Sequence, residues 1–180
     1  MKRALMASCP DGGVAEYSER LLVGSVGLIN HHEVEPAFCF GHGLTFSEFT
    51  YIGLTVVRRS TGTGAEDVSL SIRFTVTNTG SNSAADIPQV YLAGLPSGCW
   101  RATAAAQGIK KTAVVEPIRT RQDGSTITTG HDEVVTLELT PRDLSIWDVT
   151  EHRFKVFRGE FTAFVGASSC DIRLTGAATV

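Results

Sequence analysis

Apolar and polar side chains alternate along one unbroken stretch of the chain, DVSLSIRFTVTNTG at residues 67–80. This two-residue period is typical of a β-strand with one side on a hydrophobic core and the other in water, because successive side chains of a strand point to opposite faces. Asn78-Thr79-Gly80 is a turn signal, which predicts that the strand ends there. The predicted core face carries Val68, Leu70, Ile72, Phe74 and Val76, and the predicted water face carries Ser69, Ser71, Arg73, Thr75 and Thr77.

The same alternation recurs twice nearer the C-terminus. One stretch places Val135, Leu137 and Leu139 on one face, with Thr136 and Glu138 facing out. The other is HRFKVFRGEFTAFVG at residues 152–166, which alternates on both sides of a glycine and so predicts a hairpin that turns at that glycine. Its predicted core residues are Phe154 and Val156 before Gly159, then Phe161, Ala163 and Val165.

Further strands are expected near residues 50–58, 86–93, 112–118 and 171–175. About seven short strands separated by turns predict an all-β protein that packs two sheets as a sandwich, as immunoglobulin-like domains do. Pro141 follows a predicted strand, and we expect the chain to leave the sheet there and cross over. Residues 14–24 could form at most a short helical turn, and the chain holds no long amphipathic helix pattern.

The first fifty residues show little periodicity and carry several glycines, the pair His31-His32 and the aromatic segment PAFCFGHGLTFSEFTY at 36–51. We therefore expect an extended N-terminal arm over residues 1–50 that packs on a partner, followed by the sandwich over residues 51–180. The segment at 36–51 has three possible interpretations, because a catalytic loop, a metal-binding corner and a packing segment between two domains would all be rich in glycine and aromatic residues.

Length and charge narrow the class of protein. A chain of 180 residues holds one ordinary domain. Its net charge of −3 is interspersed, and Lys110, Lys111, Arg119 and Arg121 are too widely spread to form a nucleic-acid footprint. No apolar run approaches the ~20 residues of a membrane span. The opening MKRALMASCPDGG is too short in its apolar centre for a secretion signal, so we expect either a cytosolic protein or a start further upstream, and the compartment stays open.

Cysteine and histidine suggest two kinds of site. Cys9, Cys39, Cys99 and Cys170 form no CxxC pair; they allow three disulfide pairings, and we favour buried free thiols. A zinc site would draw on Cys39, His42, His31 and His32, but structural zinc needs four ligands and only Cys39 and His42 are suitably spaced, so we favour packing. Ser168-Ser169-Cys170 has no histidine in a recognisable arrangement, which argues against nucleophilic catalysis.

Carboxylates beside tryptophans raise the question of sugar binding. Asp143 and Asp148 flank Trp147, but we expect Asp143 to cap the crossover or pair with Arg142, and Trp147 to fill the sandwich core. Trp100 lies on a predicted loop, where we expect it to cap the core rather than stack on a sugar. Asp171 and Arg173 suit a local surface ion pair.

Six segments follow one another in a recognisable order over residues 17–175. They are YSERLLVG (17–24), GHGLTFSEFTY (41–51), FTVTNTG (74–80), QVYLAGLP (89–96), LTPRDLSIWD (139–148) and GEFTAFVGASSCDIRL (159–174). Together they resemble glycoside hydrolase family 3, the β-glucosidases and β-xylosidases. The resemblance implies the C-terminal fibronectin type III-like domain of that family, with the segment that leads into it from an α/β sandwich domain. Departures occur at Arg20, Ser25-Val26, Cys39 (where the family has proline) and Phe46 (where it has tyrosine), and residues 105–118 do not align.

The resemblance also implies where the chemistry lies. Glycoside hydrolysis needs two carboxyl groups across the scissile bond, and in this family both come from upstream domains, one of them a barrel of ~250 residues. We therefore expect no catalytic, cofactor-binding or metal-binding residue in this chain. It would be a non-catalytic accessory domain, a fragment lacking the barrel, whose parent hydrolyses terminal β-linked glucose or xylose and whose partners are the upstream catalytic domains. The alternative is a stand-alone sandwich that binds a protein or a carbohydrate. We interpret the segment at 36–51 as a packing junction that locks the sandwich to a neighbouring domain; in the stand-alone alternative its aromatic patch would be the binding surface.

Overall fold

The computed structural model describes residues 37–60, 62, 67–94, 105–109, 112–116, 119–120, 126–127 and 132–180, with backbone alone at 105–109, 119–120 and 126–127. Every regular secondary-structure element among the described residues is a β-strand. The described residues include no helix long and apolar enough to cross a membrane. The strands are β1 (Phe49–Ser60), β2 (Val68–Asn78), β3 (Gln89–Ala93), β4 (Ala105–Ile109), β5 (Arg119–Thr120), β6 (Thr126–Ile127), β7 (Glu133–Leu139), β8 (Ser145–Asp148), β9 (Arg153–Val156), β10 (Glu160–Gly166) and β11 (Ile172–Thr179).

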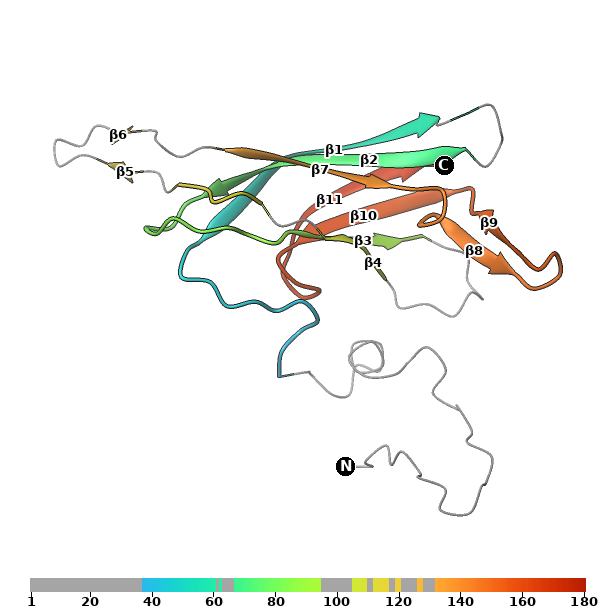
Figure 1. Ribbon diagram of the computed structural model, residues 1–180, viewed down its shortest axis with the longest axis horizontal. Coiled ribbons are helices and arrows are strands. Elements are labelled where there is room, and N and C mark those ends of the chain that lie inside the picture. The colour runs from blue at the N-terminus through green and yellow to red at the C-terminus, as the bar shows by residue number, and fades with distance from the viewer. Residues whose placement is uncertain are drawn as a thin grey trace, which may run out of the picture.

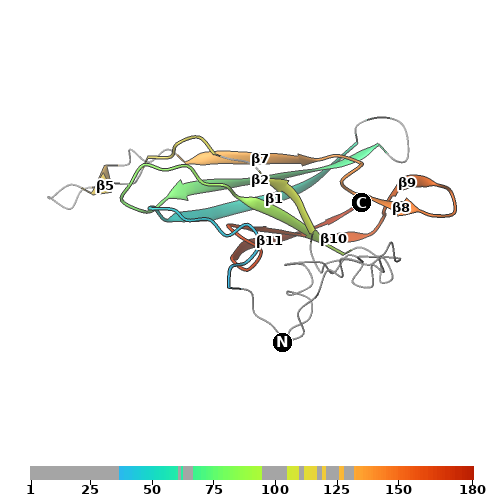
Figure 2. The same cartoon turned by 60° about the horizontal axis from the view of Figure 1, so that its bottom comes forward.

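Seven of these strands form two antiparallel sheets that lie face to face (Figures 1 and 2). One sheet has the order β1-β2-β7 and the other β11-β10-β3-β4, while β5-β6 and β8-β9 are separate two-stranded ribbons. Side chains from both sheets meet in a single buried cluster. The predicted all-β sandwich is therefore confirmed.

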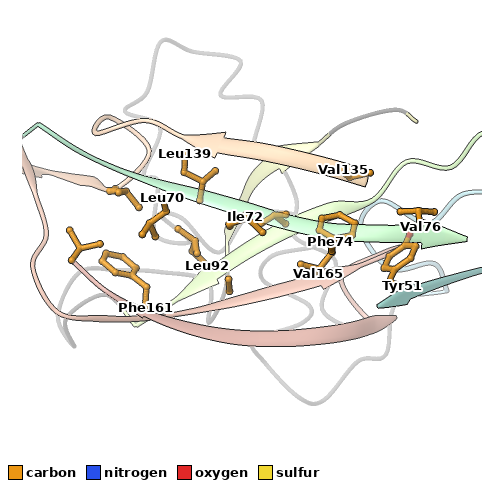
Figure 3. Close-up of a cluster of buried hydrophobic side chains, with 14 of the residues drawn as sticks. Tyr51, Leu70, Ile72, Phe74, Val76, Leu92, Val135, Leu139, Phe161 and Val165 are labelled. Atoms are coloured by element: carbon orange, nitrogen blue, oxygen red, sulfur yellow. The ribbon is translucent and has the colours of Figure 1, made fainter. Parts of the chain in front are cut away.

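The core forms on the central strand β2, whose alternation works as predicted (Figure 3). Leu70, Ile72, Phe74 and Val76 are fully buried and face Val165 and Phe161 of the opposite sheet. The outer face differs in part from the prediction. Ser69 and Ser71 are buried as well. Both are paired with β1, and Ser71 is also paired with β7, where it donates a hydrogen bond to Glu138 Oε1 at 2.6 Å.

The other predicted strands are mostly found. β7 alternates as expected, with Val135 and Leu139 buried, and β1, β3 and β11 overlap the ranges 50–58, 86–93 and 171–175. The strand expected at 112–118 is wrong over its described part: residues 112–116 contribute only one bridge, between Val115 and Ala84. The edge strand β4, with the sequence AAQGI, was not predicted, because it has no alternating pattern.

The hairpin predicted over residues 152–166 is wrong. β9 pairs with β8, while β10 lies between β11 and β3 in the four-stranded sheet. Gly159, the predicted turn, instead exchanges two backbone hydrogen bonds with Val180. Phe161, Ala163 and Val165 are all buried in the core, so burial of this face selected β3 and β11 as partners over the nearest neighbour in sequence.

The crossover predicted at Pro141 is present as a turn, but a different residue enters the core there. Asp143 caps the turn: its Oδ2 accepts from the Thr140 backbone N–H at 2.8 Å. Leu144 is fully buried, whereas Trp147, predicted to fill the core, is 49% exposed on the β8-β9 ribbon. Figures 1 and 2 both show this ribbon at one end of the sandwich. The position of Trp147 on that ribbon keeps its ring away from the core.

Candidate docking surface

Residues 37–46 precede β1 and carry large apolar side chains that face solvent. We call this stretch the docking segment. Leu44 and Phe46 are 94% and 93% exposed, and Phe38 and Phe40 are also exposed. The environment of the aromatic side chains changes after Ser47: Phe49 and Tyr51 of β1 are buried in the core. Apolar side chains that are scattered singly over a surface are ordinary, but four within one short segment indicate a surface for a partner.

A disulfide joins the docking segment to the sandwich. Cys39 and Cys170 are bonded, with their Cα atoms 5.9 Å apart and a sequence separation of 131. Cys170 lies in the turn between β10 and β11, and the Ser169 N–H beside it donates to Phe40 O at 3.0 Å. Figure 1 shows the segment alongside this turn. For these two cysteines the preference for free thiols was wrong; Cys9 and Cys99 lie outside the described residues.

Gln89 provides a second attachment. Its Nε2 donates to Gly41 O at 2.9 Å and to Ala167 O at 3.0 Å, and its Oε1 accepts from the Tyr91 hydroxyl. Gly41 has φ +77°, and a Cβ placed there would lie 2.0 Å from Gln89 Oε1. Glycine is therefore required at residue 41 both by the backbone conformation and by the close approach of the Gln89 amide.

A buried amide anchors the end of the docking segment. Asn78 is fully buried; its Nδ2 donates to Asn82 O and Val115 O, each at 2.8 Å, and its Oδ1 accepts from Ser47 Oγ at 2.6 Å and from Gly80 N. This single side chain therefore connects β2, the chain before β1 and the bridge at Val115. The predicted turn at residues 78–80 is present, and the buried amide of its first residue holds it.

Arg173 ties β11 to the start of β1. It forms the predicted ion pair with Asp171 at 2.8 Å, but it also donates to Phe49 O at 2.6 Å, and its guanidinium lies over the Tyr51 ring. The Tyr51 hydroxyl donates to Asp86 Oδ2 at 2.5 Å. Burial, reinforced by Asp86, raises the pKa of Tyr51 above its usual range, so the hydroxyl keeps its proton and remains a donor.

A groove with both polar and apolar lining residues lies beside the docking segment. Its volume is about 710 Å³, and it runs between the segment, the 85–89 stretch and the β10-β11 turn. Within the described residues no three His, Cys, Asp or Glu side chains form a group that could hold a metal ion. The sulfur of Cys39 is in the disulfide, and the ring of His42 lies 5.1 Å from that of Phe38. The polar lining residues are His42, Thr45, Glu48, Thr50, Asp86, Gln89 and Arg173.

Some of the remaining candidates from the sequence lie within the described residues, and the others lie outside them. Ser168 accepts hydrogen bonds from the N–H groups of Cys170 and Asp171 and so shapes a turn. Of the two roles expected for Asp143, capping is the one observed. Arg142 instead lies over the ring of Phe154, which also contacts Trp147, and so forms a cation–π contact. The other group, His31, His32, Trp100, Lys110, Lys111, Arg121 and the side chain of Arg119, lies outside the described residues.

The β8-β9 ribbon carries an exposed charge network that gives a pH prediction. Asp148 accepts from the Glu151 and Thr150 N–H groups and pairs with Lys155 at 2.9 Å. These contacts, the Glu151 N–H first, lower the pKa of Asp148 from 3.8 to about 2. A lowered folded-state pKa stabilises the ribbon above the unfolded value, near pH 4, and this stabilisation is lost as the pH falls towards 2.

We expect an NMR titration of the Asp148 carboxyl carbon to show a midpoint near pH 2. Asp148→Asn is the control, since it removes this titration while the other carboxyl signals remain. A midpoint near pH 4 would show that the ribbon contacts do not form in solution.

Comparisons with known proteins agree with this architecture. The model of the fibronectin type III-like domain family matches residues 123–169. The Aspergillus niger protein named "Probable beta-glucosidase D" is 35% identical over 162 residues, covering 83% of this chain and 20% of that protein. The chain thus spans about a fifth of the length of the relatives it matches.

Solved structures with the same fold are β-glucosidases too. DesR, a β-glucosidase from Streptomyces venezuelae, superposes with a TM-score of 0.73 at 29% identity, over 91% of this chain and 19% of that one. The GH3 β-glucosidase of Bifidobacterium adolescentis superposes with a TM-score of 0.73 at 26% identity, over 94% of this chain and 23% of that one. The sandwich, the family model and these relatives together show that the chain is a fibronectin type III-like domain, similar to the one that glycoside hydrolase family 3 β-glucosidases carry.

Proposed function

We propose that this chain is the non-catalytic accessory domain of a family 3 β-glucosidase, and that the docking segment packs it against the catalytic part of that enzyme. The parent activity would be hydrolysis of terminal β-linked glucose. The observation that carries this proposal is the docking segment itself: four exposed apolar side chains held on the sandwich by a disulfide and by Gln89. Covering such a surface removes apolar area from water, which favours association.

We also propose that the chain divides near residue 50, into a linking arm and the sandwich. The start of β1 at Phe49 supports this boundary, as does the change from exposed to buried side chains after Ser47.

The proposal predicts that the isolated 180-residue chain does not hydrolyse nitrophenyl glucoside or nitrophenyl xyloside. The carboxylates considered as candidates, Asp143 and Asp148, have structural roles: each accepts hydrogen bonds from backbone N–H groups of its own turn. A full-length family 3 β-glucosidase in the same assay is the positive control. Turnover that followed the purified chain and was lost in Asp143→Asn or Asp148→Asn would place the chemistry here instead.

The association itself is tested by the size of the native product. An antibody against residues 131–175 should detect a protein far larger than 19.3 kDa, with peptides from a catalytic domain. A product of 19.3 kDa would favour the second candidate, a stand-alone module that binds a protein or a carbohydrate. The half-exposed Trp147 favours carbohydrate in that case, since an aromatic ring offers a stacking surface for a sugar.

A further inference from the structure

We propose that the Cys39–Cys170 disulfide is a redox-sensitive clip: while it is intact it holds the docking segment on the sandwich, and its reduction releases the segment without unfolding the sheets. The clip is a property of this chain alone. Its consequence for association rests on the proposed function.

Few interactions other than the disulfide hold the start of the docking segment. Among the described residues, the hydrogen bonds from residues 38–43 to the sandwich are Ser169 N–H to Phe40 O and Gln89 Nε2 to Gly41 O. The His42 N–H to Cys39 O bond and the contact between Phe38 and His42 lie within the segment itself. The aromatic side chains of Phe38 and Phe40 are exposed and contribute no burial in the core. The covalent bond is therefore the main constraint on this part of the segment.

The two segments that the disulfide joins differ in how much they need it to stay in place. The turn that carries Cys170 is closed by its own hydrogen bonds, from Ala167 N to Asp171 O and from Asp171 N to Ser168 O, and it joins two paired strands. Among the described residues no strand pairs with the docking segment, and the next hydrogen bond that holds it runs from Asn82 Nδ2 to Phe46 O. Breaking the disulfide should thus free the segment and leave the turn in place.

Reductant can reach the bond. Cys170 is exposed and Cys39 is half-buried, so we expect the reductant to attack the sulfur of the more exposed residue, on the turn. A small dithiol, as its thiolate, attacks Cys170 Sγ and forms a mixed disulfide, and the Cys39 sulfur leaves as a thiolate that takes up a proton. The second thiol of the reductant, as its thiolate, then attacks the reductant sulfur of the mixed disulfide. The bond to Cys170 Sγ breaks, and Cys170 leaves as a thiolate that takes up a proton. The protein gains two electrons and two protons, and the dithiol becomes a cyclic disulfide.

Release of the docking segment matters for association because the disulfide orders this surface before a partner binds. With the clip closed, the docking segment is held in one arrangement before a partner arrives. With the clip open, binding must also order the segment, and that cost is taken from the affinity.

The first experiment tests the clip on the isolated chain. Chymotrypsin cuts after Phe40, Leu44 and Phe46, and mass spectrometry counts the fragments that begin at the next residue. Cleavage of an exposed segment follows the population of its open state, so we expect dithiothreitol to accelerate these cuts by about tenfold while cleavage within β2 stays slow.

Two double variants complete this test. Cys39→Ser with Cys170→Ser should be cut fast with or without dithiothreitol, whereas Cys9→Ser with Cys99→Ser should keep the full response to reduction. Equal cleavage of the oxidised and reduced chain would overturn the clip. So would alkylation that finds Cys39 and Cys170 as thiols in protein prepared under oxidising conditions.

The second experiment tests the consequence on the native product, and its failure can be told from failure of the clip. In that protein we expect the three sites to be protected while oxidised and cleaved after reduction. Fast cleavage in both redox states, alongside a normal response of the isolated chain, would leave the clip standing and overturn docking through this segment. Protection that persists after reduction would overturn the dependence of docking on the disulfide.

Discussion

Replacing Phe74 with alanine is expected to lower the free energy of unfolding by about 3–5 kcal/mol, the usual loss for a large aromatic side chain in a packed core. Phe74 is fully buried at the middle of β2 and contacts the ring of Tyr51, with centroids 5.7 Å apart. Paired strands flank it on both sides, so the surrounding backbone cannot collapse into the space that the ring leaves. Urea denaturation followed by tryptophan fluorescence measures the loss.

Phe46→Ala is the matched control for this prediction. It removes the same atoms from a side chain that is 93% exposed, so the free energy of unfolding should change by less than about 0.5 kcal/mol. If both variants lost the same stability, the docking segment would be part of the core in solution, and the division between buried and exposed phenylalanines would be wrong.

Asn78→Ala is the second large effect, with an expected loss of about 3 kcal/mol. The substitution removes four hydrogen bonds and leaves their partners, the carbonyls of Asn82 and Val115, the hydroxyl of Ser47 and the N–H of Gly80, to find others. A buried donor or acceptor left without a partner costs about 1–3 kcal/mol. Part of the loss is recovered where water reaches the turn. The same urea denaturation gives the difference between variant and parent.

Asn82→Ala is the control here, because its side chain makes one exposed hydrogen bond, to Phe46 O, while the backbone carbonyl that Asn78 uses is unchanged. We expect a loss of less than about 1 kcal/mol. A loss from Asn82→Ala as large as that from Asn78→Ala would mean that the turn as a whole, and not the buried amide, determines the stability.

Strands with one buried face could be predicted from the chain alone. In β2 and β7 the apolar residues recur at every second position over at least three repeats, and a slip of one residue would expose the whole set. The collinear segments that resemble family 3 led to the same sandwich and to an expectation of no chemistry in this chain. Strands without that pattern, such as β4 and β8, were missed.

The candidate site was predicted only in outline. The aromatic segment at 36–51 was identified as a packing junction, but Gln89 and Asn78 were read only as parts of resembling segments or turns. A signal for the disulfide was available in the resemblance: Cys39 replaces a proline of the family pattern, and Cys170 lies within another of the six segments. Sequence could not pair them, because the two cysteines are 131 positions apart along the chain.

The amino-acid order by itself determined the strands of period two, the turns at residues 78–80 and at Pro141, and hence the two-sheet class, because these depend on neighbours within a few residues. Tertiary structure decided everything that joins distant positions. It placed β10 between β3 and β11 instead of beside β9, since that arrangement buries Phe161, Ala163 and Val165. It also turned Trp147 outward, because Leu144 already fills the core at the crossover, and it brought Cys39 to Cys170. Those outcomes depend on which surfaces fit together in space, and periodicity along the chain carries no information about that.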